Sequence, residues 1–129
     1  MGDIPRGNRP LSPHLSVYRL PMAAITSILT RATGQIMLAG LLLIVWWLVA
    51  AVAGPRAFAQ ADWVLRSWLG YLVLLGSVWA LWYHFLAGIR HFFYDAGLLL
   101  TREDARQASW FIVAGSVVLT LLTVILFVF

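Results

Sequence analysis

The 129-residue sequence contains no cysteine. It therefore holds no disulfide, no thiolate nucleophile and no cysteine ligand for zinc or an iron–sulfur cluster. Lysine is absent too, so all nine basic residues are arginines, against only five acidic residues. Because so few charges cannot cover a chain that is 62% hydrophobic, a disordered tail and an ordinary water-soluble enzyme are excluded. The arginines are scattered and form no cluster that follows phosphates, which argues against nucleic-acid binding.

Three segments lack Asp, Glu, Lys and Arg altogether, namely 32–55, 67–89 and 107–129. A helix rises 1.5 Å per residue and needs roughly 20 residues to cross a hydrocarbon core of about 30 Å, so each segment is long enough to span. We predict a single-domain, all-α integral membrane protein in the lipid bilayer. Its three transmembrane helices are expected over about 32–54, 66–90 and 107–129.

The first thirty residues contain four prolines and several arginines, but no apolar core of a signal peptide. Prolines at this density prevent a regular helix. We therefore expect residues 1–30 to form an extended, proline-rich arm on the cytoplasmic membrane surface. The start of an interfacial helix is expected just after Pro21.

The arginines are distributed unevenly between the two sides of the predicted helices. Only Arg56 and Arg66 fall on one side. The positive-inside rule places the opposite side, with the N-terminus, in the cytoplasm. Since no mitochondrial targeting feature is visible, we expect a multi-pass protein of the bacterial cytoplasmic (inner) membrane. The seven arginines of the cytoplasmic side are Arg6, Arg9, Arg19, Arg31, Arg90, Arg102 and Arg106.

His84 is the most informative polar residue within a predicted span. It precedes Arg90, taken to mark the cytoplasmic interface, by six residues and so lies about 9 Å below that surface. Gly76, Ala80 and Gly88 recur at four-residue intervals around it and leave one face of the helix open. Such a face accommodates either a second helix or a haem whose iron binds the imidazole. The pattern alone does not decide between them.

His91 lies seven residues after His84, which is about 10 Å along a helix. The two axial positions of one haem are only about 4 Å apart at Fe–N bonds of roughly 2 Å, so these two histidines cannot share a haem. If His84 binds a six-coordinate haem, the second axial ligand must therefore come from another chain. His91 is interpreted either as an interfacial hydrogen-bonding residue or as a cofactor-binding residue. Asp95, one turn further, could orient His91, help pass protons or cap the helix.

Ser27 and Arg31 are four residues apart and share one face of the helix that enters the membrane. In one interpretation Arg31 extends to lipid headgroups. In the other, the pair binds an anionic or carbonyl oxygen, such as that of a haem propionate or a quinone.

The strings RPLSPHLSVY, SILTRATG and HFLAGIRHFFYD together resemble the cytochrome b membrane anchor of succinate dehydrogenase, respiratory complex II. The resemblance covers nearly the whole chain, including the order of its three helices. It implies half of a haem-binding helical anchor that serves electron transport and the tricarboxylic acid cycle. A second small membrane-anchor subunit supplies the other half.

The resemblance also implies roles for single residues. His84 is expected to be an axial ligand of haem b iron, and Ser27 and Arg31 to line a ubiquinone site. Arg31 is expected near a haem propionate, and His91 is kept as a cofactor-binding candidate. Thr30 stands where many members have histidine, so a propionate contact from that position is expected to be weaker or absent.

The implied partners are a flavoprotein subunit and an iron–sulfur subunit, which oxidise succinate and deliver electrons to the membrane. The chain alone is therefore not expected to hold a complete catalytic site. Two alternatives stay open: an anchor of the fumarate reductase type, and a non-redox three-helix structural subunit.

Overall fold

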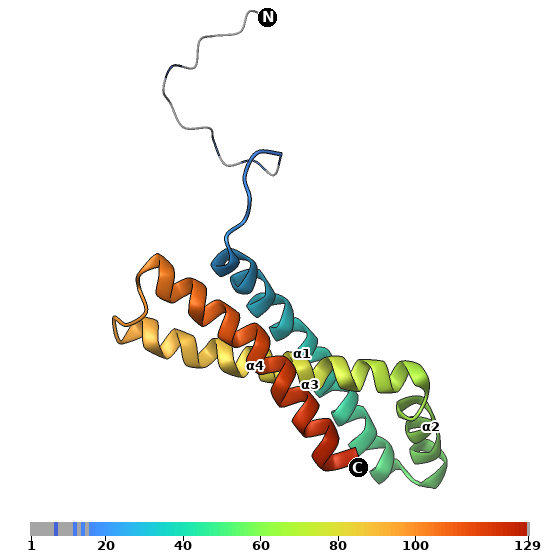
Figure 1. Ribbon diagram of the computed structural model, residues 1–129. Coiled ribbons are helices and arrows are strands. Elements are labelled where there is room, and N and C mark those ends of the chain that lie inside the picture. The colour runs from blue at the N-terminus through green and yellow to red at the C-terminus, as the bar shows by residue number, and fades with distance from the viewer. Residues whose placement is uncertain (1–6, 8–11, 13, 15, 129) are drawn as a thin grey trace, which may run out of the picture.

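The structure, a computed structural model, describes residues 7, 12, 14 and 16–128 of the chain. These residues form four helices and no strand: α1 (Met22–Ala53), α2 (Pro55–Leu65), α3 (Trp68–Asp95) and α4 (Arg102–Val128) (Figure 1). Three of them, α1, α3 and α4, are long and apolar enough to cross a membrane. The prediction of an all-α protein with three spans is confirmed.

Helix α1 begins directly after Pro21 and runs without a break into the first span. Pro21 is extended, with φ −66° and ψ 155°. At the other end Gly54 adopts φ 121°, a conformation that side chains other than that of glycine rarely adopt, and Pro55 then opens α2. The interfacial start and the membrane span are thus one continuous helix. Of the predicted arm, residues 1–6, 8–11, 13 and 15 lie outside the described residues, and residues 22–30 belong to α1 and are not extended.

Helix α2 was not predicted, because its eleven residues mix polar and apolar side chains and are too few for a span. Its Phe58 packs against Trp47 of α1, with ring centroids 5.6 Å apart. Its last turn carries an ion pair between Asp62 and Arg66, 2.9 Å apart, and hydrogen bonding to this carboxylate raises the pKa of Arg66 above its ordinary value. Trp63 is 75% exposed, as expected of an aromatic residue at a membrane interface.

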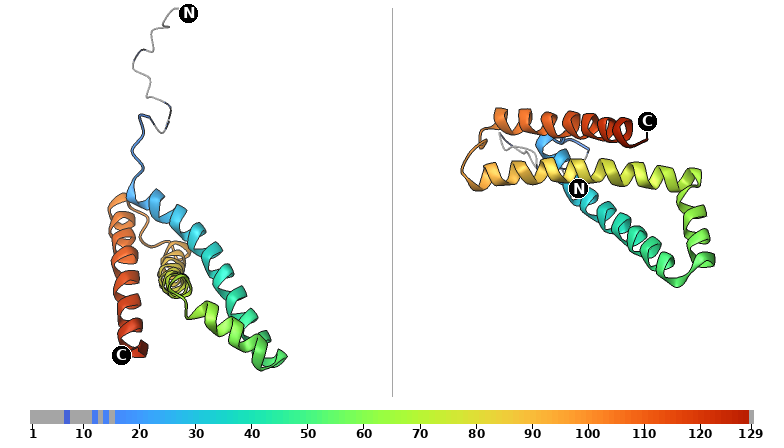
Figure 2. Two further views of the ribbon diagram at one scale, coloured as in Figure 1. Left: turned by 90° about the vertical axis from the view of Figure 1, so that its right-hand side faces the viewer. Right: turned by 90° about the horizontal axis from the view of Figure 1, so that it is seen from below.

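Helix α3 is the central element and packs against both α1 and α4. Figure 2 shows it crossing between the other two spans. Ser67 caps its N-terminus by accepting a hydrogen bond from the Gly70 amide at 3.1 Å. The end of α3 and the start of α4 lie close together because the loop from 96 to 101 is short (Figure 1). The start of α1 contacts both helices there, through the hydrogen bonds of Thr26 to Arg90 and Ser109.

The interior of the described part is small and unusually polar. Its apolar centre consists of Tyr83, Leu86, Ala87 and Ile112. Most large apolar side chains instead point outward, which suits a chain whose solvent is lipid. Small hydroxyl residues allow the helices to approach closely. The buried polar residues are Thr26, Thr33, Arg90, Ser109, Ser116 and Thr120.

Candidate functional site

His84 lies on α3, partly buried, with its ring turned toward α1. Its Nδ1 is 3.1 Å from the carbonyl oxygen of Thr30 and 3.4 Å from the hydroxyl of Thr33. Because a carbonyl oxygen only accepts, the shorter contact assigns the ring proton to Nδ1. This leaves the lone pair on Nε2, the arrangement that metal-binding histidines commonly have.

Gly34 provides the space that the His84 ring occupies. A Cβ atom at this position would lie 3.3 Å from Cε1 of His84, closer than most side-chain contacts. The glycine that ends the string SILTRATG therefore packs against the histidine that opens HFLAGIRHFFYD. Two motifs fifty residues apart in sequence thus meet in one site.

The stripe of small residues around His84 divides into two parts. Ala80 is fully buried within the chain. At Gly76 and Gly88, in contrast, an added Cβ would find no atom within 4 Å. Packing within the described chain therefore accounts for Ala80 alone, and the space beside the two glycines is left to another molecule or subunit.

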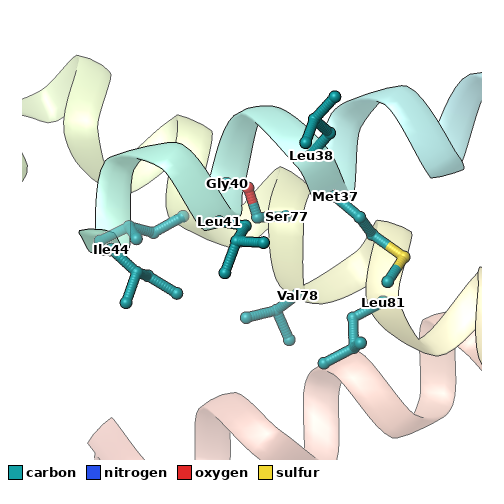
Figure 3. A pocket seen from close by; sticks show the side chains of 9 residues that line it. Met37, Leu38, Gly40, Leu41, Ile44, Ser77, Val78 and Leu81 are labelled. Atoms are coloured by element: carbon teal, nitrogen blue, oxygen red, sulfur yellow. The ribbon is translucent and has the colours of Figure 1, made fainter. Parts of the chain in front are cut away.

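An apolar groove of about 500 Å³ lies between α1 and α3, on the side of His84 that faces away from Arg90 along the chain. Leu81, one turn from His84, lines it, and Figure 3 shows the side chains of both helices around the space. Ser77 supplies its one hydroxyl, which is buried and finds no hydrogen-bond partner among the described residues. The complete lining is Met37, Leu38, Gly40, Leu41, Ile44, Leu74, Ser77, Val78 and Leu81.

Ser27 and Arg31 lie one turn apart on α1, the first half-buried and the second exposed. Within the described residues Arg31 forms no ion pair. The hydroxyl of Thr30 donates to the Thr26 carbonyl at 2.8 Å, while the carbonyl of Thr30 holds His84. The same two turns of α1 thus carry Ser27, Arg31 and the contacts to His84.

His91 is exposed on α3, and its ring lies nearly perpendicular to that of Tyr94, with centroids 6.1 Å apart. The structure does not bring it beside His84, because one continuous helix carries both. Asp95, the last residue of α3, is exposed as well. In the described part of the chain no group of three or more His, Asp or Glu side chains is able to hold a metal ion. A metal at His84 therefore needs ligands from outside this part.

The position of Arg90 at the predicted cytoplasmic interface implies a side chain that faces the lipid headgroups. In the structure the side chain does not face them. It is only 5% exposed and points into the contact between the three long helices. Its Nη1 donates to Thr26 at 2.9 Å and to Ser109 at 3.3 Å. The sequence did not predict that Arg90 is buried and links the helices, although Arg90 follows the buried Tyr83 and Ala87 on the same helical face.

Comparison with known proteins identifies the family. Residues 5–123 match the family described as succinate dehydrogenase/fumarate reductase transmembrane subunit. The chain is 66% identical to the succinate dehydrogenase cytochrome b556 subunit of Paracoccus denitrificans, over 98% of each chain. It is 32% identical to the cytochrome b556 subunit of Rickettsia conorii, over 88% of this chain and 89% of the other. The cytochrome b560 subunit of Reclinomonas americana is 30% identical, over 93% and 87%.

These matches extend along nearly the whole chain and include both strings that meet at His84. The three apolar helices agree with a transmembrane subunit. The chain belongs to the family of succinate dehydrogenase/fumarate reductase transmembrane subunits and, within it, to the cytochrome b membrane anchors of succinate dehydrogenase.

Proposed function

We propose that the chain binds haem b together with a second small anchor subunit and forms part of the site that reduces ubiquinone. The observation that carries this proposal is His84: its Nδ1 is hydrogen-bonded to the Thr30 carbonyl, so its Nε2 lone pair is available to iron. The names of the relatives, cytochrome b556 and b560, support haem b as the group concerned.

The surroundings of His84 fit a haem. The groove that starts at Leu81 is almost entirely apolar and suits a macrocycle, and the described chain leaves open space beside Gly76 and Gly88. When bound, haem would supply one-electron chemistry. The chain itself fixes the imidazole of His84. The Thr30 carbonyl sets the tautomer of the ring, and Gly34 leaves the space in which the ring packs against α1. The second axial ligand is assigned to the other anchor subunit, because His91 lies two turns away on the same helix.

Ser27 and Arg31 are assigned to the quinone. A hydroxyl and a guanidinium on one helical face donate hydrogen bonds to a carbonyl oxygen, and a fixed cation stabilises negative charge that develops there. Arg31 also lies next to Thr30, the residue that holds His84, which supports its contact with a haem propionate. His91, exposed on the same α3, is assigned to the rim of the cofactor site, where its partner would come from another subunit.

The proposed partners are the flavoprotein and iron–sulfur subunits, which would supply electrons from succinate. We assign the chain to the bacterial inner membrane with its N-terminal side in the cytoplasm. The arginine distribution supports this orientation: within the described residues, Arg56 and Arg66 lie between α1 and α3, at the end opposite to most other arginines. The fumarate reductase type of anchor is the second candidate, since the matching family includes both enzymes.

The test is a reduced-minus-oxidised visible spectrum of the complex purified from its native membrane through a tag on this chain. We expect a b-type haem signal together with flavin and iron–sulfur subunits. The same partners without haem would contradict the haem assignment and leave His84 a structural residue. A complex that reduces fumarate with quinol faster than it oxidises succinate would favour the second candidate.

A further inference from the structure

A buried polar cluster ties α1, α3 and α4 together near the turn that carries Ser27. We call Thr26, Tyr83, Arg90 and Ser109 the Arg90 cluster. Arg90 is 5% exposed and the other three are fully buried. Nη1 of Arg90 donates both to Thr26 on α1 and to Ser109 on α4, and the hydroxyl of Thr26 lies 3.1 Å from that of Ser109. One guanidinium thus reaches the two neighbouring helices at once.

The cluster fixes a single turn of α1 on α3. The hydroxyl of Thr26 accepts from Arg90 and its carbonyl accepts from the Tyr83 hydroxyl at 3.0 Å. Four residues on, the Thr30 carbonyl accepts from His84 at 3.1 Å. The turn from 26 to 30 is therefore held by α3 at both of its ends. Ser27 lies inside this turn and Arg31 follows it directly.

The charge of Arg90 is not balanced by a carboxylate among the described residues. Its Nε is buried and has no hydrogen-bond partner in the part of the chain that the structure describes, and its Cζ lies 5.6 Å from the centre of the Tyr94 ring, the distance of a cation–π contact. Arginine stays protonated in proteins, so this is a buried cation in a span. Such residues are expensive within a membrane and mark functional sites by default.

We propose that Arg90 is a positioning residue for quinone reduction. It acts through Thr26, setting the height and rotation of the α1 turn that presents Ser27 and Arg31, and does not itself contact quinone. Arginine suits this role because its guanidinium carries five N–H donors and a permanent charge, so that one side chain reaches acceptors on two helices. The inference rests on the proposed function, since it assumes that Ser27 and Arg31 bind quinone.

The test uses Thr26→Val in the complete membrane-bound complex, because valine keeps the shape of threonine but cannot accept from Arg90. We expect the KM for a short-chain ubiquinone to rise about tenfold, the lower end of what loss of one hydrogen bond to a charged group commonly produces. The kcat should fall as well, because Arg31 is proposed to stabilise charge that develops during the reaction, whereas the haem spectrum should change little, because the contact between Thr30 and His84 stays. Thr26→Ser keeps the hydroxyl and should restore the KM.

The matched control is Thr123→Val, which removes the 2.9 Å hydrogen bond from Trp82 between α3 and α4 without touching α1. It should leave the KM unchanged. The proposal is overturned by an unchanged KM in Thr26→Val, by a Thr26→Ser complex as impaired as Thr26→Val, or by an equal rise in Thr123→Val.

If Thr26→Val does not assemble, Ser109→Ala decides on the same measurement. It removes the second acceptor of Arg90, at 3.3 Å, and also the hydroxyl that accepts from Thr26 at 3.1 Å, so the hold on Thr26 is weakened and the KM should rise about twofold. An unchanged KM overturns the proposal. Arg31→Ala distinguishes a failure of the proposed function from a failure of the role of Arg90. If Arg31→Ala leaves quinone reduction intact, the proposed function fails. If Arg31→Ala loses quinone reduction but Thr26→Val does not change it, only the role of Arg90 is removed.

Discussion

The contact between α1 and α3 has two regions with opposite character. In the region that contains Thr26, Thr30 and His84, polar groups are linked by hydrogen bonds within the chain. In the region from Met37 to Ile44, the helices leave an apolar groove whose one hydroxyl, on Ser77, finds no partner in the described residues. In the first region only Nε of Arg90 is buried without a partner among the described residues, whereas the second region is lined almost wholly by apolar side chains. A rigid polar end can orient ligands, while the open apolar part needs an occupant from outside.

The largest effect is expected from removing the exposed cation of the polar region. Arg31→Ala should lower succinate-driven ubiquinone reduction about a hundredfold, because a fixed donor facing developing charge contributes that much in comparable sites. Succinate oxidation with a soluble artificial acceptor should persist, since the flavoprotein subunit that we propose to oxidise succinate is a separate chain. Arg102→Ala, an exposed arginine at the start of α4, is the control. Undiminished quinone reduction in Arg31→Ala would remove this residue from the site.

The boundary between the two regions is tested at Gly34. Gly34→Leu forces a side chain into the space beside Cε1 of His84, so we expect about tenfold weaker haem retention, as for other changes that displace a metal-binding histidine. Haem retention is measured as the haem content per flavin in the purified complex. Ala39→Leu adds the same bulk on an exposed part of α1 and should have no effect. Full haem content in Gly34→Leu would show that the ring position is not critical.

The open face is tested at Gly88, where the described chain places nothing near an added Cβ. If haem or the second anchor covers this face, Gly88→Leu should reduce copurification of that subunit or of haem by a few-fold, since small residues permit close approach. A complex of unchanged composition would mean that this face contacts only lipid.

The smallest effect is expected deep in the groove. Ser77→Ala removes a hydroxyl that has no partner among the described residues, so the free energy of unfolding should stay the same or rise by about 1 kcal/mol at most, and the thermal midpoint of the complex should not fall. Ser116→Ala is the matched comparison, because the Ser116 hydroxyl donates to the Val113 carbonyl at 2.9 Å and its loss should not stabilise. A marked loss of stability in Ser77→Ala would reveal a bound partner for this hydroxyl in the complex.

The three spans could be predicted from sequence because uncharged segments of this length have few alternatives to a membrane helix. Helix α2 could not, since eleven residues of mixed polarity carry no comparable signal. His84 stood out as a titratable group within a span. The burial of Arg90 was missed because an arginine near a helix end is usually solvated. Only the packing of three helices shows that Thr26 and Ser109 enclose it.

The central claim is that His84, and not His91, binds haem iron. The most direct measurement compares reduced-minus-oxidised spectra of complexes that carry His84→Ala or His91→Ala, with flavin content as the measure of assembly. We predict that His84→Ala loses or strongly alters the b-type signal, and that His91→Ala retains the signal with at most a small shift. A wild-type spectrum in His84→Ala would contradict the account and move the ligand to another residue.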